Sequence, residues 1–152
     1  MAAEQLVPYN AEAIAPDVAR AIEIYEIQLG RVQSGQGGEE VFTEFRLRHG
    51  VYGQRDEGSQ MIRVKIPYGG LDADQLEILA DIGEEFSDCI IHITTRQDVQ
   101  YHYVDINNTP ELMRRLASVG ITTKEACGNV VRNVTACPLS GVCNDETFDV
   151  TP

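Results

Sequence analysis

The sequence predicts an α+β fold in which a strand, a helix, two strands and a second helix follow one another. Residues 61–66 and 90–106 are rich in β-branched and aromatic side chains, as strands are. Residues 71–86 and 109–119 place apolar side chains at helical spacing and begin with residues that favour helix starts. This order matches most of a split βαβ, ferredoxin-like unit, whose final strand would come from residue 127 onward or from chain that is absent.

The first strand and helix follow from local patterns. Arg63 and Lys65 alternate with apolar residues at 62, 64 and 66, before turn residues at 67–70. Arg63 therefore points away from the face that Ile62 occupies. In the next helix, Asp72 is placed as the N-cap, and residues 76, 79, 82 and 86 form an apolar stripe that should cover one face of the sheet.

The later strands, residues 90–95 and 99–106, are joined at 96–98, which predicts a hairpin or two consecutive strands. Thr109 is placed as the cap of the second helix, with Pro110 at its first position and an acid next to it. Gly120 is its expected stop.

The first 40 residues or so predict a helix, with residues 13, 14, 18, 22 and 25 at roughly helical spacing and a glycine loop at 35–38. We interpret this helix as an arm rather than part of the core. The stretch 49–59 predicts an exposed loop, so the ordered domain is expected to begin near Gln60. We divide the chain into an N-terminal arm (1–45), a half-domain (46–122) and the start of a second domain (123–152).

Composition limits the classes of function. Acidic residues outnumber basic ones 24 to 12, for a formal net charge of -12, which argues against affinity for nucleic acid or anionic membranes. No apolar run approaches the roughly 20 residues of a spanning helix, and no export signal begins the chain. We expect a soluble, cytoplasmic protein in which any anion site is local.

Four polar side chains are expected to share one face of the hairpin. Thr94, Arg96, Gln100 and His102 have even numbers, whereas the apolar residues of the same strands are odd. Such donors suit a ligand that bears several carboxylates, or a small oxyanion. The alternative is an ordinary solvated face, which composition alone favours.

Arg132 stands in a segment of small, apolar and amide residues, 128–138, which indicates partial burial. A buried guanidinium needs an internal acid or a ligand anion, and this pattern leaves both open.

The cysteines and histidines give weaker signals. Cys137 and Cys143 have a spacing that would suit one metal cluster, but four ligands are normally needed, so core or loop thiols are favoured, as for Cys89 and Cys127. The three histidines show no zinc spacing, and no nucleotide-binding motif is present.

Three strings in order, MIRVKIPYGG, HITTRQDVQYH and ACGNVVRNVTACP, resemble the N-terminal half of sirohaem-containing assimilatory sulfite and nitrite reductases. The resemblance implies that Arg63 and Arg132 flank the substrate anion. It also implies that sirohaem carboxylates are held by the matching polar side chains, namely Thr94, Arg96, Gln100 and His102, with Asn133 a weaker candidate. Residues 123–152 would then begin a sirohaem-binding domain.

The same resemblance implies a six-electron reduction of sulfite to sulfide or of nitrite to ammonia, on sirohaem coupled to a [4Fe-4S] cluster. The sequence stops at Pro152, before the family's cluster cysteines, so the cluster ligands are expected outside this chain and the chain alone is expected to be inactive. Expected partners are the C-terminal half of the enzyme, a ferredoxin or flavoprotein donor and, for the isolated fragment, a second copy.

The sequence leaves open two other functions for this chain. One is a stand-alone ferredoxin-like module that binds a tetrapyrrole or an anion without turnover. The other is an interaction domain whose arginines make internal salt bridges.

Overall fold

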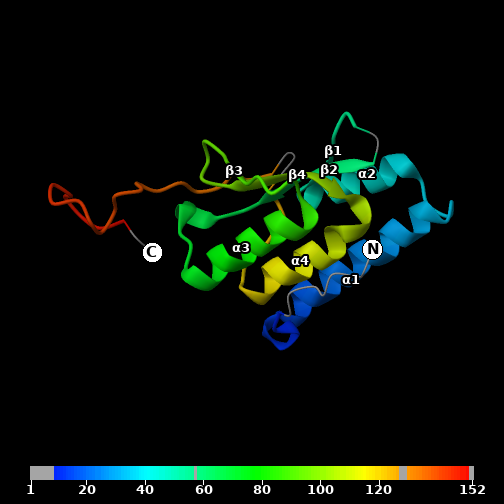
Figure 1. Cartoon of the computed structure of the whole chain (residues 1–152), viewed down its shortest axis with the longest axis horizontal. Coiled ribbons are helices and arrows are strands. Elements are labelled where there is room, and N and C mark those ends of the chain that lie inside the picture. The colour runs from blue at the N-terminus through cyan, green and yellow to red at the C-terminus, as the bar shows by residue number, and fades with distance from the viewer. Residues whose placement is uncertain (1–8, 57, 127–129, 151–152) are drawn as a thin grey trace.

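The computed structural model of the chain describes residues 9–56, 58–126 and 130–150. The strands are β1 (Val51–Gly53), β2 (Ser59–Val64), β3 (His92–Ile93) and β4 (Val99–Asp105). The α-helices are α1 (Pro16–Gln33), α2 (Glu39–Arg48), α3 (Ala73–Phe86) and α4 (Thr109–Ser118). The short 3-10 helices are η1 (Ala11–Ala13), η2 (Pro67–Gly69) and η3 (Ile106–Asn108). Helices α1, α3 and α4 lie on one side of the sheet (Figure 1), which confirms the predicted α+β class.

The sheet has the order β1-β2-β4-β3, and all its neighbouring strands are antiparallel. The succession β2, α3, β3, β4, α4 is the predicted ferredoxin-like order. The register shifts where His102 and Tyr103 together oppose Met61. At this bulge Tyr103 has a φ of +58° and its ring is exposed, so the even and odd faces of β4 stop alternating here.

Strand β1, which precedes β2 in the chain, occupies the edge beside β2 where the final strand of a ferredoxin-like unit would lie. Strand β1 pairs with residues 60–62 of β2, and a single bridge from Thr122 to Lys65 continues that edge. The expected strand from Cys127 onward is therefore not needed to complete the sheet, and Cys127 itself lies outside the described residues.

The core lies between the sheet and the helices. Ile62 and Tyr101 from the sheet meet Leu79 and Leu116 from the helices, and all four are buried. The Tyr101 hydroxyl donates to the Leu79 carbonyl at 2.7 Å, so even the polar end of this ring is satisfied. Asp72 caps α3 in a reciprocal capping box, as predicted.

The interpretation of the N-terminal helix as an arm outside the core is wrong. Ile22, Tyr25 and Leu29 of α1 are buried in the same apolar cluster as the sheet residues. Thr109 at the start of α4 donates to the Tyr25 hydroxyl at 3.2 Å. The three α1 residues lie on one stripe, which packs on α4 and so makes α1 part of the domain.

The expected exposed loop at 49–59 is also corrected, because it contains β1. Val51 is fully buried, and the backbone nitrogen of Arg63 donates to the carbonyl of Gly50 at 2.9 Å. Gly50 has a φ of +76°, and a Cβ there would lie 2.7 Å from the Arg63 carbonyl oxygen, so the close approach requires glycine. The ordered fold therefore begins well before Gln60.

Three local predictions need smaller corrections. The strand expected at 90–95 is reduced to β3, where Ile93 is 82% exposed. Leu76 of the predicted stripe is exposed, and Thr109 is the first helical residue rather than the cap, which is Asn108. The stop at Gly120 is confirmed by its φ of +75°.

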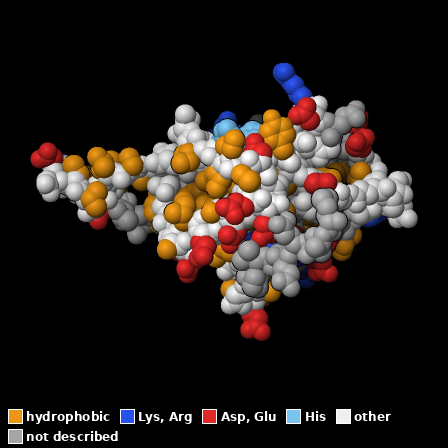
Figure 2. All heavy atoms as spheres, in the orientation of Figure 1, with side chains coloured by type: hydrophobic (Ala, Val, Ile, Leu, Met, Phe, Trp, Pro, Cys, Tyr) orange, Lys and Arg blue, Asp and Glu red, His pale blue; other side chains and the backbone are white. Residues whose placement is uncertain are grey.

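Residues 137–150 extend away from the domain as a chain of turns (Figure 1). The Ser140 hydroxyl shares its proton between a Glu146 oxygen at 2.8 Å and an Asp149 oxygen at 3.0 Å, which holds the turns together. Apolar side chains gather on the surface of this segment (Figure 2), among them the exposed Leu139, Val142 and Phe148. Within the described parts of the chain, no helix has the length and apolar character needed to cross a membrane.

Candidate anion-binding site

A cleft of about 420 Å³ lies on the sheet face opposite the core. Four basic side chains line it, and two acids, Asp98 and Glu125, lie among its walls. The basic residues, which we call the cleft cations, are Arg63, Lys65, Arg96 and Arg132. In a chain of net charge -12, four cations against two acids make this a local positive site.

Strand β2 presents Arg63 to the cleft, as the alternation predicted. Its register partner on β4 is Gln100. With the Gln100 amide turned so that its oxygen faces the guanidinium, that oxygen accepts from Arg63 Nε at 2.8 Å and also from Nη2. Gln100 therefore holds the guanidinium in place by a neutral contact, which leaves its charge uncompensated.

The β3–β4 hairpin turn presents Arg96. The Thr94 hydroxyl accepts from the backbone nitrogens of Arg96 at 3.3 Å and Asp98 at 3.1 Å, and the Thr94 nitrogen donates to the Asp98 carbonyl at 2.8 Å. The two acceptor positions of this hydroxyl thus shape the turn, and its proton is left to donate into the cleft.

Residues 130–136, which we call the strap, cross the hairpin and carry Arg132. The Asn133 amide donates to the carbonyls of Ile66 at 2.6 Å and Arg96 at 2.9 Å. The Gln97 side chain both donates to and accepts from the backbone of Ala136, at 2.8 and 3.1 Å. Because these bonds join residues far apart in sequence, the strap takes its path from tertiary contacts.

The expectation that Arg132 is partly buried is wrong. Arg132 is exposed at the wall of the cleft, and the buried residue of the strap is Asn133. Asn133 uses its amide protons on the main chain, while its oxygen is buried without a hydrogen-bond partner among the described residues. Its clear role is to anchor the strap.

His102 is separated from the other predicted site residues. Arg63, Arg132, Thr94, Arg96, Gln100 and Asn133 all line the cleft, but His102 does not. Its ring meets His92 edge-on with centroids 4.8 Å apart, and its Nδ1 lies 3.1 Å from Gln54 Nε2. Burial, and then the neighbouring His92, lowers the pKa of His102.

Sequence reasoning missed two residues of the site, Lys65 and Asp98. Lys65 directly follows β2, lines the cleft together with Arg63 and donates to the Val131 carbonyl of the strap at 3.4 Å. Its spacing of two from Arg63 is a signal that could have identified it. Asp98 lies at the turn, where strand alternation gives no direction.

The described ion pairs involve only Arg114 and Arg115, on the helical side of the sheet. Within residues 9–56, 58–126 and 130–150, no carboxylate therefore pairs with a cleft cation at ion-pair distance. These side chains are available to a ligand, which disfavours a domain whose arginines make internal salt bridges.

The described cysteines, Cys89, Cys137 and Cys143, are free and exposed. No cluster of three or more metal-ligating side chains occurs in the part of the chain that the structure describes. The expected position of the cluster ligands outside this chain stays a prediction.

A family profile, the Nitrite/Sulfite reductase ferredoxin-like half domain, matches residues 52–119. The chain is 33% identical to a protein named "Sulfite reductase [ferredoxin]" from Mycobacterium tuberculosis, over 95% of this chain and 30% of the relative. It is 39% identical to "Ferredoxin--nitrite reductase" from Synechococcus elongatus, over 60% of this chain and 18% of the relative.

A solved structure described as "Structure of Mycobacterium tuberculosis NirA protein" matches with a TM-score of 0.71 and 31% identity. The match covers 94% of this chain and 30% of that one. The chain therefore spans less than a third of the length of these relatives, and the agreement extends through the N-terminal helices as well as the half domain.

Proposed function

Because this chain carries the Nitrite/Sulfite reductase ferredoxin-like half domain and belongs to that family, we propose that it is the anion-facing and sirohaem-facing part of a sulfite or nitrite reductase. The observation that carries the proposal is the convergence of four cations, without paired acids among the described residues, on one cleft of an acidic chain.

Arg63 and Arg132 are proposed to bind the substrate anion. They reach the cleft from β2 and from the strap, so an oxyanion between them would meet a guanidinium fork from each side. Their fixed charges would offset the negative charge of sulfite or nitrite and polarise its oxygens. The Gln100 contact helps here, since it orients Arg63 without neutralising it.

Sirohaem carries several carboxylates, and the donors of the cleft fit such a group. We propose that Thr94, Arg96 and Gln100 hold carboxylates at the hairpin, with His102 a further contact beyond the cleft. Asn133 is proposed to act indirectly, by holding the strap in position. When bound, the macrocycle would supply the iron at which the anion is reduced by six electrons, fed by a [4Fe-4S] cluster.

The remaining parts of the reaction belong to the proposal as well. The cluster ligands and the rest of the catalytic site would lie in a C-terminal half, which the relatives' greater length accommodates. Ferredoxin is the proposed electron donor, since the names of the relatives include it. We propose either sulfite or nitrite as the substrate, because relatives named as sulfite reductases and relatives named as nitrite reductases both match the chain.

The test is an absorption titration of the chain with sirohaem. We expect saturable binding with a shifted Soret band, weakened about tenfold or more by Arg96→Gln, since a charged contact to a carboxylate contributes roughly 1.5–3 kcal/mol. Arg20→Gln is the matched control, because Arg20 is exposed on α1 and lies outside the cleft. Equal binding by both variants would contradict the assignment of Arg96.

A further inference from the structure

We propose that Asp98 takes up a proton from water when an oxyanion enters the cleft, and so stores a proton beside the bound anion. This inference rests on the proposed function, because it assumes that the cleft binds anions. It concerns Asp98, an acid of the cleft whose charge has the same sign as that of the ligand and whose position is fixed by the fold.

The Asp98 carboxylate is held rigidly in the wall of the cleft. The residue is 5% exposed, and its Oδ1 accepts from the Ile66 nitrogen at 3.1 Å. Its own backbone is tied to Thr94 through both its nitrogen and its carbonyl. Because a carboxylate anchored in this way cannot move away from an arriving anion, protonation is the change that would relieve the repulsion between them.

Charged and titratable groups line the cleft from every element around Asp98. Arg63 comes from β2, Lys65 directly follows that strand, and Arg96 comes from the turn. Three other cleft residues complete the set, namely His92 of β3, Glu125 after α4 and Arg132 of the strap. Burial raises the pKa of Asp98, while the hydrogen bond from the Ile66 nitrogen and the nearby charges of Arg63, Lys65 and Arg96 act in the opposite direction. The proton affinity of Asp98 therefore depends on how much of this positive charge is uncompensated.

An oxyanion bound to the same cations removes that compensation. Its negative charge offsets the guanidinium groups and also repels the carboxylate directly, and both effects favour protonated Asp98. By thermodynamic linkage, protonated Asp98 must in turn favour the anion by the same factor. Anion affinity is then highest at acidic pH and falls as pH rises from the pKa of free Asp98 to that of the anion-bound form.

The stored proton would suit the proposed reaction, in which oxygen atoms of the anion leave as water and protons are consumed. Protonated Asp98 would be a neutral proton donor within the cleft. An additional lysine would donate a proton only by adding a further positive charge to the site. Its hydrogen bond to Ile66 also means that Asp98→Asn keeps an acceptor of the same shape while removing the titration.

The experiment uses the 152-residue chain, with nitrite as the probe. The Asp98 carboxyl carbon is followed by 13C NMR from about pH 4 to about pH 8, with and without saturating nitrite. We expect the titration midpoint to rise by about one unit with nitrite, and nitrite affinity to fall about tenfold across that window. Asp98→Asn should bind nitrite with nearly constant affinity, and Asp74→Asn, on α3, should behave as the parent.

The outcomes separate the two claims. Nitrite that shifts the Arg63 and Arg132 side-chain resonances but leaves the Asp98 midpoint unchanged overturns this inference and leaves the proposed anion site standing. Absence of any nitrite binding by the parent overturns the anion site itself, and the inference with it. The parent titration decides the question even if Asp98→Asn fails to fold.

Discussion

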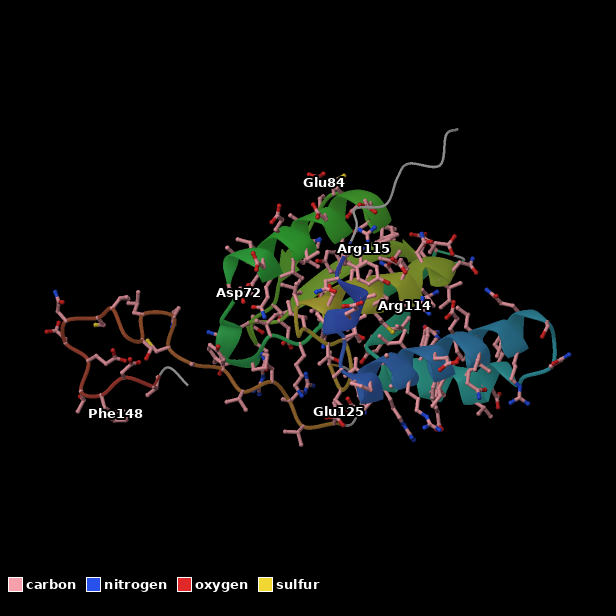
Figure 3. All side chains as sticks on the ribbon, turned by 90° about the horizontal axis from the view of Figure 1, so that it is seen from below. Asp72, Glu84, Arg114, Arg115, Glu125 and Phe148 are labelled. Atoms are coloured by element: carbon pink, nitrogen blue, oxygen red, sulfur yellow. The ribbon has the colours of Figure 1, made fainter. Side chains whose placement is uncertain are left out.

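Arg115 and the cleft arginines lie on opposite sides of one sheet and satisfy their charges differently. The Arg115 side chain is 1% exposed, and its Nη2 lies 2.8 Å from a Glu85 oxygen while Nε lies 3.7 Å from Glu111. Its guanidinium also lies 5.0 Å from the centre of the Phe86 ring. Figure 3 shows Arg115 on α4, near α3. Arg63, Arg96 and Arg132 have no such acids at ion-pair distance among the described residues.

This contrast distinguishes structural arginines from ligand-binding arginines. Arg115 Nη2 meets Glu85 off the direction of its N–H bonds, so the contact is an ion pair without a well-formed hydrogen bond. The Arg115 charge is nonetheless compensated by an ion pair inside the fold, whereas the Arg63 guanidinium is oriented by a neutral amide and has no carboxylate at ion-pair distance among the described residues. We infer that removing Arg115 affects stability and that removing Arg63 affects binding.

The largest expected effect is on stability, from Arg115→Ala. This change creates a cavity between α3 and α4 and removes the partner of Glu85, so it should destabilise the fold by about 3 kcal/mol. Arg115→Met fills the space and should cost only about 1 kcal/mol, because Glu85 can be solvated. Urea unfolding measures both. Equal losses would mean that the charge, not the volume, is what Arg115 contributes.

The next effect is on anion affinity, from Arg63→Gln. Loss of a charged donor should weaken nitrite binding by about 2 kcal/mol, or roughly thirtyfold, while the free energy of unfolding changes by less than about 1 kcal/mol. Calorimetric titration and urea unfolding report the two quantities. A loss of stability comparable to that of Arg115→Ala would remove the distinction between the two sides of the sheet.

A smaller effect is expected from Asn133→Ala. The variant loses the bonds to Ile66 and Arg96 but also removes an unpartnered buried oxygen, so the net cost should be about 1 kcal/mol. The strap should loosen, which amide hydrogen exchange detects at Tyr68, whose nitrogen donates to the Val134 carbonyl. Val134→Ala, at an exposed strap position, serves as the control.

The smallest effect is a pH dependence from His49, in the helical layer. Burial lowers the pKa of this side chain below 6.5, although its contact with the Phe45 carbonyl acts in the other direction. The unfolded chain therefore binds the proton first, so stability is complete above about pH 6.5 and declines as pH falls below it. His49→Gln should lack this component in urea unfolding measured across that range.

The local elements were predictable because their signals lie within a few residues. The β2 alternation orients Arg63, the Asp72 cap begins α3, and the turn at 96–98 and the stop at Gly120 follow from short-range backbone preferences. Six of the seven predicted site residues line one cleft, and only His102 lies apart, next to the bulge at Tyr103. The bulge adds one residue to β4, an event that period-two counting cannot anticipate.

Periodicity and turn residues were enough to predict the α+β class, the order of its elements and the polar side of the hairpin. Three features became visible only in the folded chain: α1 joins the core, β1 fills the edge beside β2, and Asn133 rather than Arg132 is buried. Each of these outcomes depends on contacts between distant residues, such as Ile66 with Asn133. Such contacts form only when burial of apolar surface offsets the entropy of ordering the chain between them.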